Sequence, residues 1–313
     1  MTLNPMISIV SPVYKAKEIV PELVKRIKEA VEHVTHQFEI ILVDDRCPEN
    51  SWQAIVNEGM KDNRVKGIRL SRNFGQHNAI AAGLEHAMGE QVVLMDCDLQ
   101  HDPEYIPALL AKQKETGADI VFARLIQREH SAWKNFTAKG YYRFLKTISH
   151  YDIDPNLSNY SLLTRKVVNA YHQYRDYHKT YMWAIQWAGF DRAIVDVEHR
   201  GRYAGKSAYN FRKLITLALN TATTNSNKLL HITFQVGVAT SLLALLVIIY
   251  FIYQYYTSGS MEGWTSLMVV IMFFSGLIIT AIGICAIYIS NVFDQTKNRP
   301  RYLISDTIND EAL

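Results

Sequence analysis

Cysteine is scarce in this chain, and its distribution argues against two kinds of structural site. The 313 residues include Cys47, Cys97 and Cys285, which show neither CxxC pairing nor a spacing typical of zinc ligands. The pattern therefore favours neither a disulfide framework nor a zinc module. We expect the three side chains to be small apolar fillers in a reducing compartment.

A large excess of charge and the common glycine-rich phosphate loops are also missing. Lysine and arginine number 33 against 30 aspartates and glutamates, which gives a net charge of +3. Without a basic repeat or a recognised motif, this small excess argues against a nucleic-acid partner. Neither GxGxxG nor GxxxxGK[ST] occurs, so any nucleotide must be held by another device.

An N-terminal signal is not visible, because the opening residues lack a basic segment followed by a long apolar core. Two long uncharged runs lie instead at 232–261 and 263–293, separated by Glu262. Each contains a stretch, at about 234–256 and 266–288, that is long enough to cross a bilayer as a helix. A helical hairpin buried in a soluble core is the alternative.

The charges that flank these runs predict their orientation. Basic residues precede the first run and follow the second, whereas the connection carries Glu262; they are Arg212, Lys213, Lys228, Lys297, Arg299 and Arg301. The positive-inside rule therefore places both termini in the cytoplasm. Tyrosines and Trp264 cluster near the connection, as an aromatic belt would.

The first part of the chain alternates between two kinds of segment. Short, β-branched apolar runs, typical of strands buried on both faces, occur at 7–13, 38–43, 65–70, 91–96 and 118–124. Segments with apolar residues at helical spacing lie between them, at 18–34, 52–62, 78–88 and 104–117. This order predicts an α/β fold with a doubly wound, mostly parallel sheet and helices on both faces.

Polar segments follow the ends of the predicted strands, where such sheets bind their ligands. These segments are 11–14, 44–51, 71–78 and 96–104. The last begins with Asp-Cys-Asp, and alternate residues of an extended chain point to opposite sides, so Asp96 and Asp98 can do different jobs. One can bind Mg²⁺ or Mn²⁺ together with substrate phosphates, while the other contacts sugar hydroxyls or the same ion through water.

Simpler explanations compete with a metal site. A DxD tripeptide arises often by chance, and Asp102 followed by Pro103 is typical of a helix start. His77, His86 and His101 lie near the acids, as they would in a metal-dependent phosphohydrolase, but their spacing matches no HExxH motif. His86 falls on a predicted helix and is expected to be a surface or packing residue.

Four segments taken together resemble the family 2 glycosyltransferases with the GT-A fold. They are "SIVSPVYKAKEIVPELV", "EIILVDDRCPENS", "LSRNFGQHNAIAAGLEHAMGEQVVLMDCDLQHDPEYIPALL" and "RGRYAGKSAYNFRKL". The resemblance covers residues 6–230 and is greatest to the polyprenyl-phosphate branch, which includes dolichol-phosphate mannose synthase and the bactoprenol-phosphate glucosyltransferases. Two C-terminal spans are typical of the bacterial members.

The resemblance implies roles for the residues at matching positions. Nucleotide binding falls to Pro12, Val13, Tyr14, Asp44, Asp45, Asn73, Gln76 and Asp96, with Gln76 where a lysine is frequent. The implied metal ligands are Asp96, Asp98 and Gln100. A segment at 202–207 would close over the diphosphate, which makes Asp98, Arg202 and Lys206 the catalytic candidates. A solvated basic loop beside a membrane is the alternative for the last two.

The acceptor is inferred from a region that mixes basic and aromatic side chains. Residues 125–146 suit helices at a membrane surface that meet a lipid phosphate, and Arg128, Lys139 and Arg143 are its candidate phosphate ligands. The resemblance adds Arg124, which ends the segment Phe-Ala-Arg where many relatives have GxR. The chain departs from the family pattern where Asn159 and Ser161 replace an expected aspartate and arginine. A hydroxyl acceptor needs a general base, whereas a phosphate is already anionic, so the missing acid favours polyprenyl phosphate.

These expectations combine into one hypothesis about a bacterial plasma-membrane protein. It has a cytosolic GT-A domain at 1–207, a juxtamembrane amphipathic helix at 208–231, two transmembrane helices within 232–293 and a cytosolic tail at 294–313. With Mg²⁺ or Mn²⁺, it transfers a sugar with inversion from a nucleotide sugar, by resemblance a UDP-sugar, to undecaprenyl phosphate. The resemblance also implies a homo-oligomer, a tetramer in relatives. The alternatives are transfer to a hydroxyl of a membrane glycolipid and a non-catalytic module that binds a nucleotide sugar.

Overall fold

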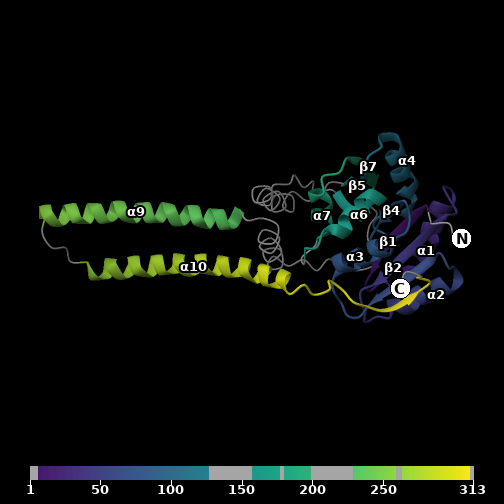
Figure 1. The fold of residues 1–313 in the computed structure, drawn as a ribbon, viewed down its shortest axis with the longest axis horizontal. Coiled ribbons are helices and arrows are strands. Elements are labelled where there is room, and N and C mark those ends of the chain that lie inside the picture. The colour runs from purple at the N-terminus through teal and green to yellow at the C-terminus, as the bar shows by residue number, and fades with distance from the viewer. Residues whose placement is uncertain (1–5, 127–156, 177–179, 199–227, 259–262, 311–313) are drawn as a thin grey trace. The chain divides into compact units, whose positions relative to one another are not determined.

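The computed structural model describes residues 6–126, 157–176, 180–198, 228–258 and 263–310. The chain forms two compact units (Figure 1). One unit is built on a β-sheet, and the other contains two long helices.

The first unit contains one eight-stranded sheet, counted over the described residues, in the order β7-β5-β6-β4-β1-β2-β3-β8. The strands are β1 Ile7–Val13, β2 Phe38–Asp44, β3 Val65–Leu70, β4 Gln91–Leu94, β5 Ile120–Ile126, β6 Leu157–Thr164, β7 Arg192–Glu198 and β8 Ile304–Ile308. Strand β1 pairs in parallel with β2 and β4, as do β2 with β3 and β5 with β7. Strands β6 and β8 run antiparallel to their neighbours. The predicted doubly wound, mostly parallel sheet is therefore confirmed.

Helices cover both faces of this sheet (Figure 1). Helices α1 Val20–Glu32, α2 Ser51–Lys61 and α4 Ile106–Thr116 pack on one face, and α4 follows the short 3-10 turn η1 Pro103–Tyr105. Helices α3 Gln76–His86, α6 Arg165–Gln173 and α7 Tyr181–Trp187 pack on the other. On β1, Ile9 enters the core on the α1 side and Val10 the core on the α3 side. Because successive side chains point to opposite faces, a strand covered on both sides must be apolar nearly throughout.

The C-terminal segment returns to the sheet through a strand that the sequence did not predict within the expected cytosolic tail at 294–313. Strand β8 pairs antiparallel with β3, and Gly67, Ile68 and Arg69 lie opposite Ile308, Thr307 and Asp306. This strand covers the edge that β3 would otherwise expose. The last described residues therefore belong to the same compact unit as the first strand.

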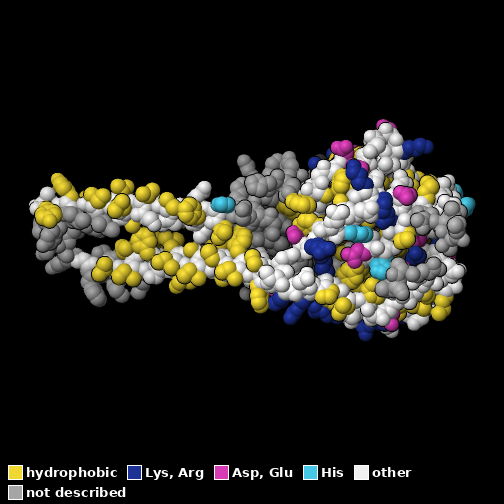
Figure 2. Space-filling model, in the orientation of Figure 1, with side chains coloured by type: hydrophobic (Ala, Val, Ile, Leu, Met, Phe, Trp, Pro, Cys, Tyr) yellow, Lys and Arg dark blue, Asp and Glu magenta, His cyan; other side chains and the backbone are white. Residues whose placement is uncertain are grey.

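The second unit contains α9 Lys228–Ser258 and α10 Trp264–Thr296, which lie side by side (Figure 1). Their 31 and 33 residues, at a rise of about 1.5 Å each, exceed the roughly 30 Å of a bilayer core. No residue is buried in their most apolar windows, Leu230–Val247 and Phe273–Thr296, and hydrophobic side chains cover both helices in Figure 2. A hairpin in a soluble core would be buried, so this exposure favours membrane association.

Candidate functional site

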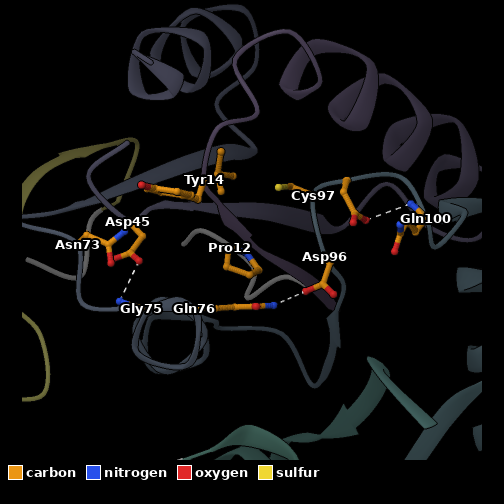
Figure 3. Close-up of a pocket in the computed structure, with 11 residues that line it drawn as sticks. Pro12, Tyr14, Asp45, Asn73, Gly75, Gln76, Asp96, Cys97 and Gln100 are labelled. Atoms are coloured by element: carbon orange, nitrogen blue, oxygen red, sulfur yellow. Dashed lines mark hydrogen bonds between the residues drawn. The ribbon is translucent and has the colours of Figure 1, made fainter. Parts of the chain in front are cut away.

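A pocket of about 420 Å³ opens where β1, β2, β3 and β4 end (Figure 3). It is lined by Pro12, Val13, Tyr14, Asp45, Asn73, Gly75, Gln76, Asp96, Cys97, Asp98 and Gln100. The residues follow four neighbouring strands, in agreement with the rule that open α/β sheets bind ligands beyond the carboxyl ends of their strands. Gly75 and Cys97 are the lining residues to which the sequence assigned no role in the site, although each lies within a motif that was assigned to it.

Asp45 ties two of these loops together. Its Oδ1 accepts a hydrogen bond from the Phe74 N–H at 2.7 Å, and its Oδ2 accepts one from the Gly75 N–H at 2.9 Å. Gly75, which precedes α3, has a φ of 92°, a conformation that favours glycine. Burial raises the pKa of Asp45, and the two N–H donors oppose that rise. The carboxylate therefore fixes the loop that carries Asn73 and leads into Gln76.

Asp44, which was expected to share the nucleotide contact with Asp45, has different surroundings. Its side chain is fully buried, its Oδ1 accepts a hydrogen bond from the Cys47 N–H at 3.2 Å, and its Oδ2 lies 3.4 Å from Arg69 Nε. Burial raises the pKa of Asp44, while the Cys47 N–H and the Arg69 charge lower it. Adjacent residues of an extended chain point to opposite sides. The structure accordingly brings Asp45, and not Asp44, into the pocket lining.

Asp96 and Asp98 follow β4 and both line the pocket. Asp96 Oδ1 accepts a hydrogen bond from Gln76 Nε2 at 2.7 Å (Figure 3), and Asp98 Oδ1 accepts one from the Gln100 N–H at 3.1 Å. Burial and the charge of Asp98 raise the pKa of Asp96 to about 6, against the lowering effect of Gln76. Leu99 has a φ of 57° without being glycine, an outlier of the kind found at functional loops.

The donor atoms at this end of the pocket fit a hard divalent cation. Mg²⁺ and Mn²⁺ prefer oxygen ligands and often bind through one or two carboxylates, with substrate phosphates as further ligands. Asp96 and Asp98 supply carboxylates, and Gln100 supplies an amide oxygen. Over the described residues, no group of three or more His, Cys, Asp or Glu side chains could hold a metal ion. A metal held here would therefore take its remaining oxygen ligands from water and the substrate.

Cys97 and Asp102 lie close in sequence to Asp96 and Asp98, and their surroundings indicate structural roles. Burial raises the pKa of the Cys97 thiol to about 12, so the thiolate nucleophile is not available at neutral pH. Asp102 Oδ1 accepts a hydrogen bond from the Glu104 N–H at 3.1 Å at the start of η1. The helix-start interpretation of Asp102 is therefore confirmed.

The three histidines near the acids have separate partners. His77 Nδ1 accepts a hydrogen bond from the Tyr181 N–H at 3.4 Å, and the His101 ring packs against Tyr160. His86 Nδ1 lies 2.6 Å from a carboxylate oxygen of the C-terminal segment. The pocket lining contains no histidine, and His86 is a packing residue, as its place on a helix predicted.

Arg124, a predicted ligand of the acceptor phosphate, lies outside this pocket lining. Its guanidinium donates two hydrogen bonds to Asp196 on β7, from Nε to Oδ1 at 2.6 Å and from Nη2 to Oδ2 at 3.0 Å. The other predicted cations lie outside the described residues; they are Arg128, Lys139, Arg143, Arg202 and Lys206. Their roles stay predictions.

The two positions that depart from the family pattern lie on β6, a strand that the sequence did not predict. Ser161 is fully buried, and its Oγ lies 2.6 Å from the hydroxyl oxygen of Tyr181. It pairs with Leu94, the last residue of β4, and Asn159 lies two residues before Ser161 on β6. A neutral amide therefore lies on the strand that pairs with β4, and Asp96 follows β4.

Known proteins resemble this chain over most of its length. The model of the family described as glycosyl transferase family 2 matches residues 8–185. The SfII prophage-derived bactoprenol glucosyl transferase of Shigella flexneri is 31% identical over 95% of this chain and 97% of its own. An uncharacterized glycosyltransferase of Bacillus subtilis, YkcC, is 30% identical over 97% of this chain and 94% of its own.

A solved structure resembles the sheet unit in its fold. Glucosyl-3-phosphoglycerate synthase from Mycobacterium tuberculosis superimposes with a TM-score of 0.51 and 15% identity, over 70% of this chain and 78% of that one. At this identity the likeness concerns the fold alone, and it agrees with the GT-A architecture expected from the sequence.

Proposed function

The chain belongs to glycosyl transferase family 2, and from this membership and its pocket we propose that it transfers a sugar from a nucleotide sugar to a polyprenyl phosphate. The observation that carries the proposal is the convergence of Asp45, Asp96 and Asp98 in one pocket where the strands end. The bactoprenol glucosyl transferases, similar to this chain over nearly their whole length, support the choice of acceptor.

The nucleoside part of the donor is assigned to the side of the pocket formed by β1 and the loop after β3. Tyr14 is 44% exposed at the pocket and offers an aromatic face against which a base can stack. Asp45 and Asn73 supply polar groups for the base or ribose. The preference for uracil rests on resemblance.

The diphosphate of the donor is anionic, and the described pocket lining supplies no cation to neutralise it. Among the described residues that line the pocket there are three aspartates and no lysine or arginine. We assign Asp98, Asp96 and Gln100 to a bound Mg²⁺ or Mn²⁺. This ion would neutralise the charge that grows on the leaving diphosphate. Arg202 and Lys206 stay the candidate side chains for the same purpose.

The proposed reaction is a single displacement at the anomeric carbon. An oxygen of the lipid phosphate forms a bond to that carbon, the bond from the carbon to the diphosphate oxygen breaks, and the nucleoside diphosphate leaves with the electron pair. The configuration is therefore inverted. The attacking phosphate is anionic at neutral pH and needs no general base, which suits the neutral Asn159 on β6, the strand next to β4.

We also propose that α9 and α10 cross the bacterial plasma membrane with both chain ends in the cytoplasm. Their length and exposed apolar surface support the crossing. The pairing of β8 with β3 supports an even number of crossings, because residues before α9 and after α10 belong to one sheet. Homo-oligomerisation stays a prediction from resemblance.

The test is transfer of radiolabel from a panel of UDP-, GDP- and dTDP-sugars into purified undecaprenyl phosphate, with Mn²⁺ or with EDTA. We expect labelled lipid from one donor, loss of labelling in EDTA, and a rate at least about a hundredfold lower in Asp98→Ala. Asp119→Ala is the matched control, because Asp119 precedes β5 at the amino end of the strands and pairs with Lys166. It should transfer sugar at the wild-type rate.

The other outcomes separate the alternatives. Label that enters a glycolipid but not undecaprenyl phosphate would replace the proposed acceptor with a hydroxyl. Nucleotide binding without transfer from any donor would leave a non-catalytic binding module. Labelling that persists in Asp98→Ala and in EDTA would remove the metal from the proposal.

A further inference from the structure

The segment that follows α10 is fastened to the sheet unit from Arg301 to Asp310. We call residues 301–310 the C-terminal strap. Arg301 donates a hydrogen bond to the Tyr174 carbonyl, and the Tyr302 hydroxyl donates one to Glu85. At the far end, Asn309 Nδ2 donates to the carbonyls of Gly59 and Val65 at 2.7 and 3.0 Å, and Asp310 pairs with His86. The strap is thus an ordered part of this unit.

One of these contacts reaches the loop that lines the pocket. The Ser71 N–H donates a hydrogen bond to the Leu303 carbonyl at 2.8 Å. Ser71 is the first residue after β3, and the loop that begins there carries Asn73 and Gly75 into the pocket. Asp45 holds the other end of the same loop through Phe74 and Gly75. The loop is therefore fixed between the strap and Asp45.

A charged contact joins the strap to the acidic pair after β2. Arg69 lies opposite Asp306, with Nη1 3.7 Å from its carboxylate, and Arg69 Nε lies 3.4 Å from Asp44 Oδ2. Asp44 is fully buried, so its partner matters more than that of an exposed acid. Asp306 of the strap thus lies near the Arg69 guanidinium. That guanidinium also faces Asp44, which precedes Asp45 in the chain.

Close packing shows that the strap fits this edge specifically. A Cβ built on Gly67 would lie 2.7 Å from Ile308 Cγ2 and 2.6 Å from Ile55 Cγ2, so only glycine lets β8 approach this closely. Ile304, at the other end of β8, packs against the core on the α3 side. Strands β3 and β8 are therefore complementary in shape as well as paired along the backbone.

We propose that the C-terminal strap is a positioning element of the pocket: by holding the end of β3, it sets the loop at 71–75 for donor binding. The proposal rests on the proposed function in taking the donor as the ligand of this pocket. Helix α10 ends at Thr296, five residues before Arg301, so the same short stretch of chain joins an apolar helix to a pocket loop. Loss of the strap should loosen this loop and weaken donor binding, while the central strands keep their order.

The test uses the chain in detergent and two measurements, with a variant that ends at Pro300. Hydrogen exchange without nucleotide should show amides at 71–75 exchanging about tenfold faster than in the wild type, with β1 and β4 unchanged. Titration with UDP and Mn²⁺ should show affinity at least about fivefold weaker. A synthetic peptide of residues 299–313 should restore both, whereas the same peptide with Ile304→Asp and Ile308→Asp should not.

Asn309→Ala is the matched control, because its side chain bonds the strap to the start of β3 rather than to the loop. It should leave exchange at 71–75 unchanged. If hydrogen exchange in β1 and β4 is also faster in the chain that ends at Pro300, the same measurements are made instead on the full-length Ile304→Asp variant. Unchanged exchange at 71–75 in a folded strap variant would overturn the proposal. If the wild type fails to bind UDP, the donor assignment is wrong. Hydrogen exchange at 71–75 still tests, without any ligand, whether the strap fixes the loop.

Discussion

Gln76 lines the pocket without adding a positive charge to it. Its amide donates to Asp96 at 2.7 Å and brings no charge, although the family often has lysine at this position. The described lining is left with three carboxylates and no cation of its own. At the scale of one residue, this composition supports the proposed dependence of the pocket on a bound metal ion.

The substitution Gln76→Lys tests this dependence. An ammonium group beside Asp96 and Asp98 would repel a divalent cation and compete for the same oxygens. We expect the Mn²⁺ concentration for half-maximal sugar transfer to rise about tenfold, with less effect on the rate at saturating metal. The measurement is a Mn²⁺ titration of transfer at fixed donor concentration.

Gln76→Met separates charge from the hydrogen bond, because it removes the bond to Asp96 without adding a cation. It should shift the Mn²⁺ requirement less than Gln76→Lys does. Equal shifts in the two variants would assign the effect to the lost hydrogen bond, and a lysine variant with the wild-type requirement would contradict the charge argument.

Asn159 supports a second prediction at the residue scale. Asn159 lies on β6, next to the strand that leads to Asp96, so Asn159→Asp would add a carboxylate near the place where an anionic acceptor is proposed to approach. We expect KM for undecaprenyl phosphate to rise about fivefold, because like charges repel. Steady-state kinetics with varied lipid would measure this. Faster transfer in Asn159→Asp, above all to a hydroxyl-bearing glycolipid, would instead favour an acceptor that needs a general base.

At the scale of elements, the sequence predicts the buried parallel strands well and the antiparallel ones poorly. Strands β1 and β3 have the predicted bounds, since a strand covered on both faces is continuously apolar. Strand β8 has the sequence ISDTI, in which Ser305 and Asp306 are exposed at the edge. Its partner β3 lies more than 230 residues earlier, and no local pattern shows such a pairing.

The sequence likewise predicted one part of the candidate site and not the other. The strand-end rule placed the loops after β1 to β4 in one pocket, because that rule depends on topology alone. It could not decide between Asp44 and Asp45, since the choice depends on which carboxylate meets Arg69 and which meets the loop before α3. Contacts between side chains from distant segments need the packed structure.

The loop before α3 allows a prediction about one element. Gly75 has a φ of 92°, and a Cβ built on it meets no atom within 4 Å, so Gly75→Ala adds backbone strain without a clash. We expect a loss of about 1–2 kcal/mol in stability and a higher KM for the nucleotide sugar, because the loop carries pocket residues. Thermal unfolding and donor kinetics measure the two effects.

Gly117→Ala is the matched control for that substitution. Gly117 follows α4 with a φ of 67° and also has no atom within 4 Å of a built Cβ, but it does not line the pocket. It should lose similar stability with an unchanged KM. If Gly75→Ala alters KM no more than Gly117→Ala does, the conformation of the loop has no part in donor binding.

At the scale of the whole molecule, the sheet constrains the topology of the chain. Strands β1 to β7 precede α9 and β8 follows α10, yet all belong to one sheet. A bilayer cannot pass through a hydrogen-bonded sheet, so β7, before the pair of helices, and β8, after it, must lie on one side. If α9 crosses the membrane, α10 must cross back. The basic residues before α9 and after α10 agree with a cytoplasmic position for that side.

This constraint predicts the labelling of single cysteines in a chain whose native Cys47, Cys97 and Cys285 are replaced by alanine. In spheroplasts, a membrane-impermeant maleimide should label Tyr256→Cys, near the end of α9, without permeabilisation. It should label Arg299→Cys, five residues before β8, only after permeabilisation, because β8 holds that residue on the side of the sheet. The cysteine-free chain gives the background. Labelling of both positions in sealed cells, or protection of both, would contradict a paired crossing, since neither is compatible with helix ends on opposite sides of the membrane.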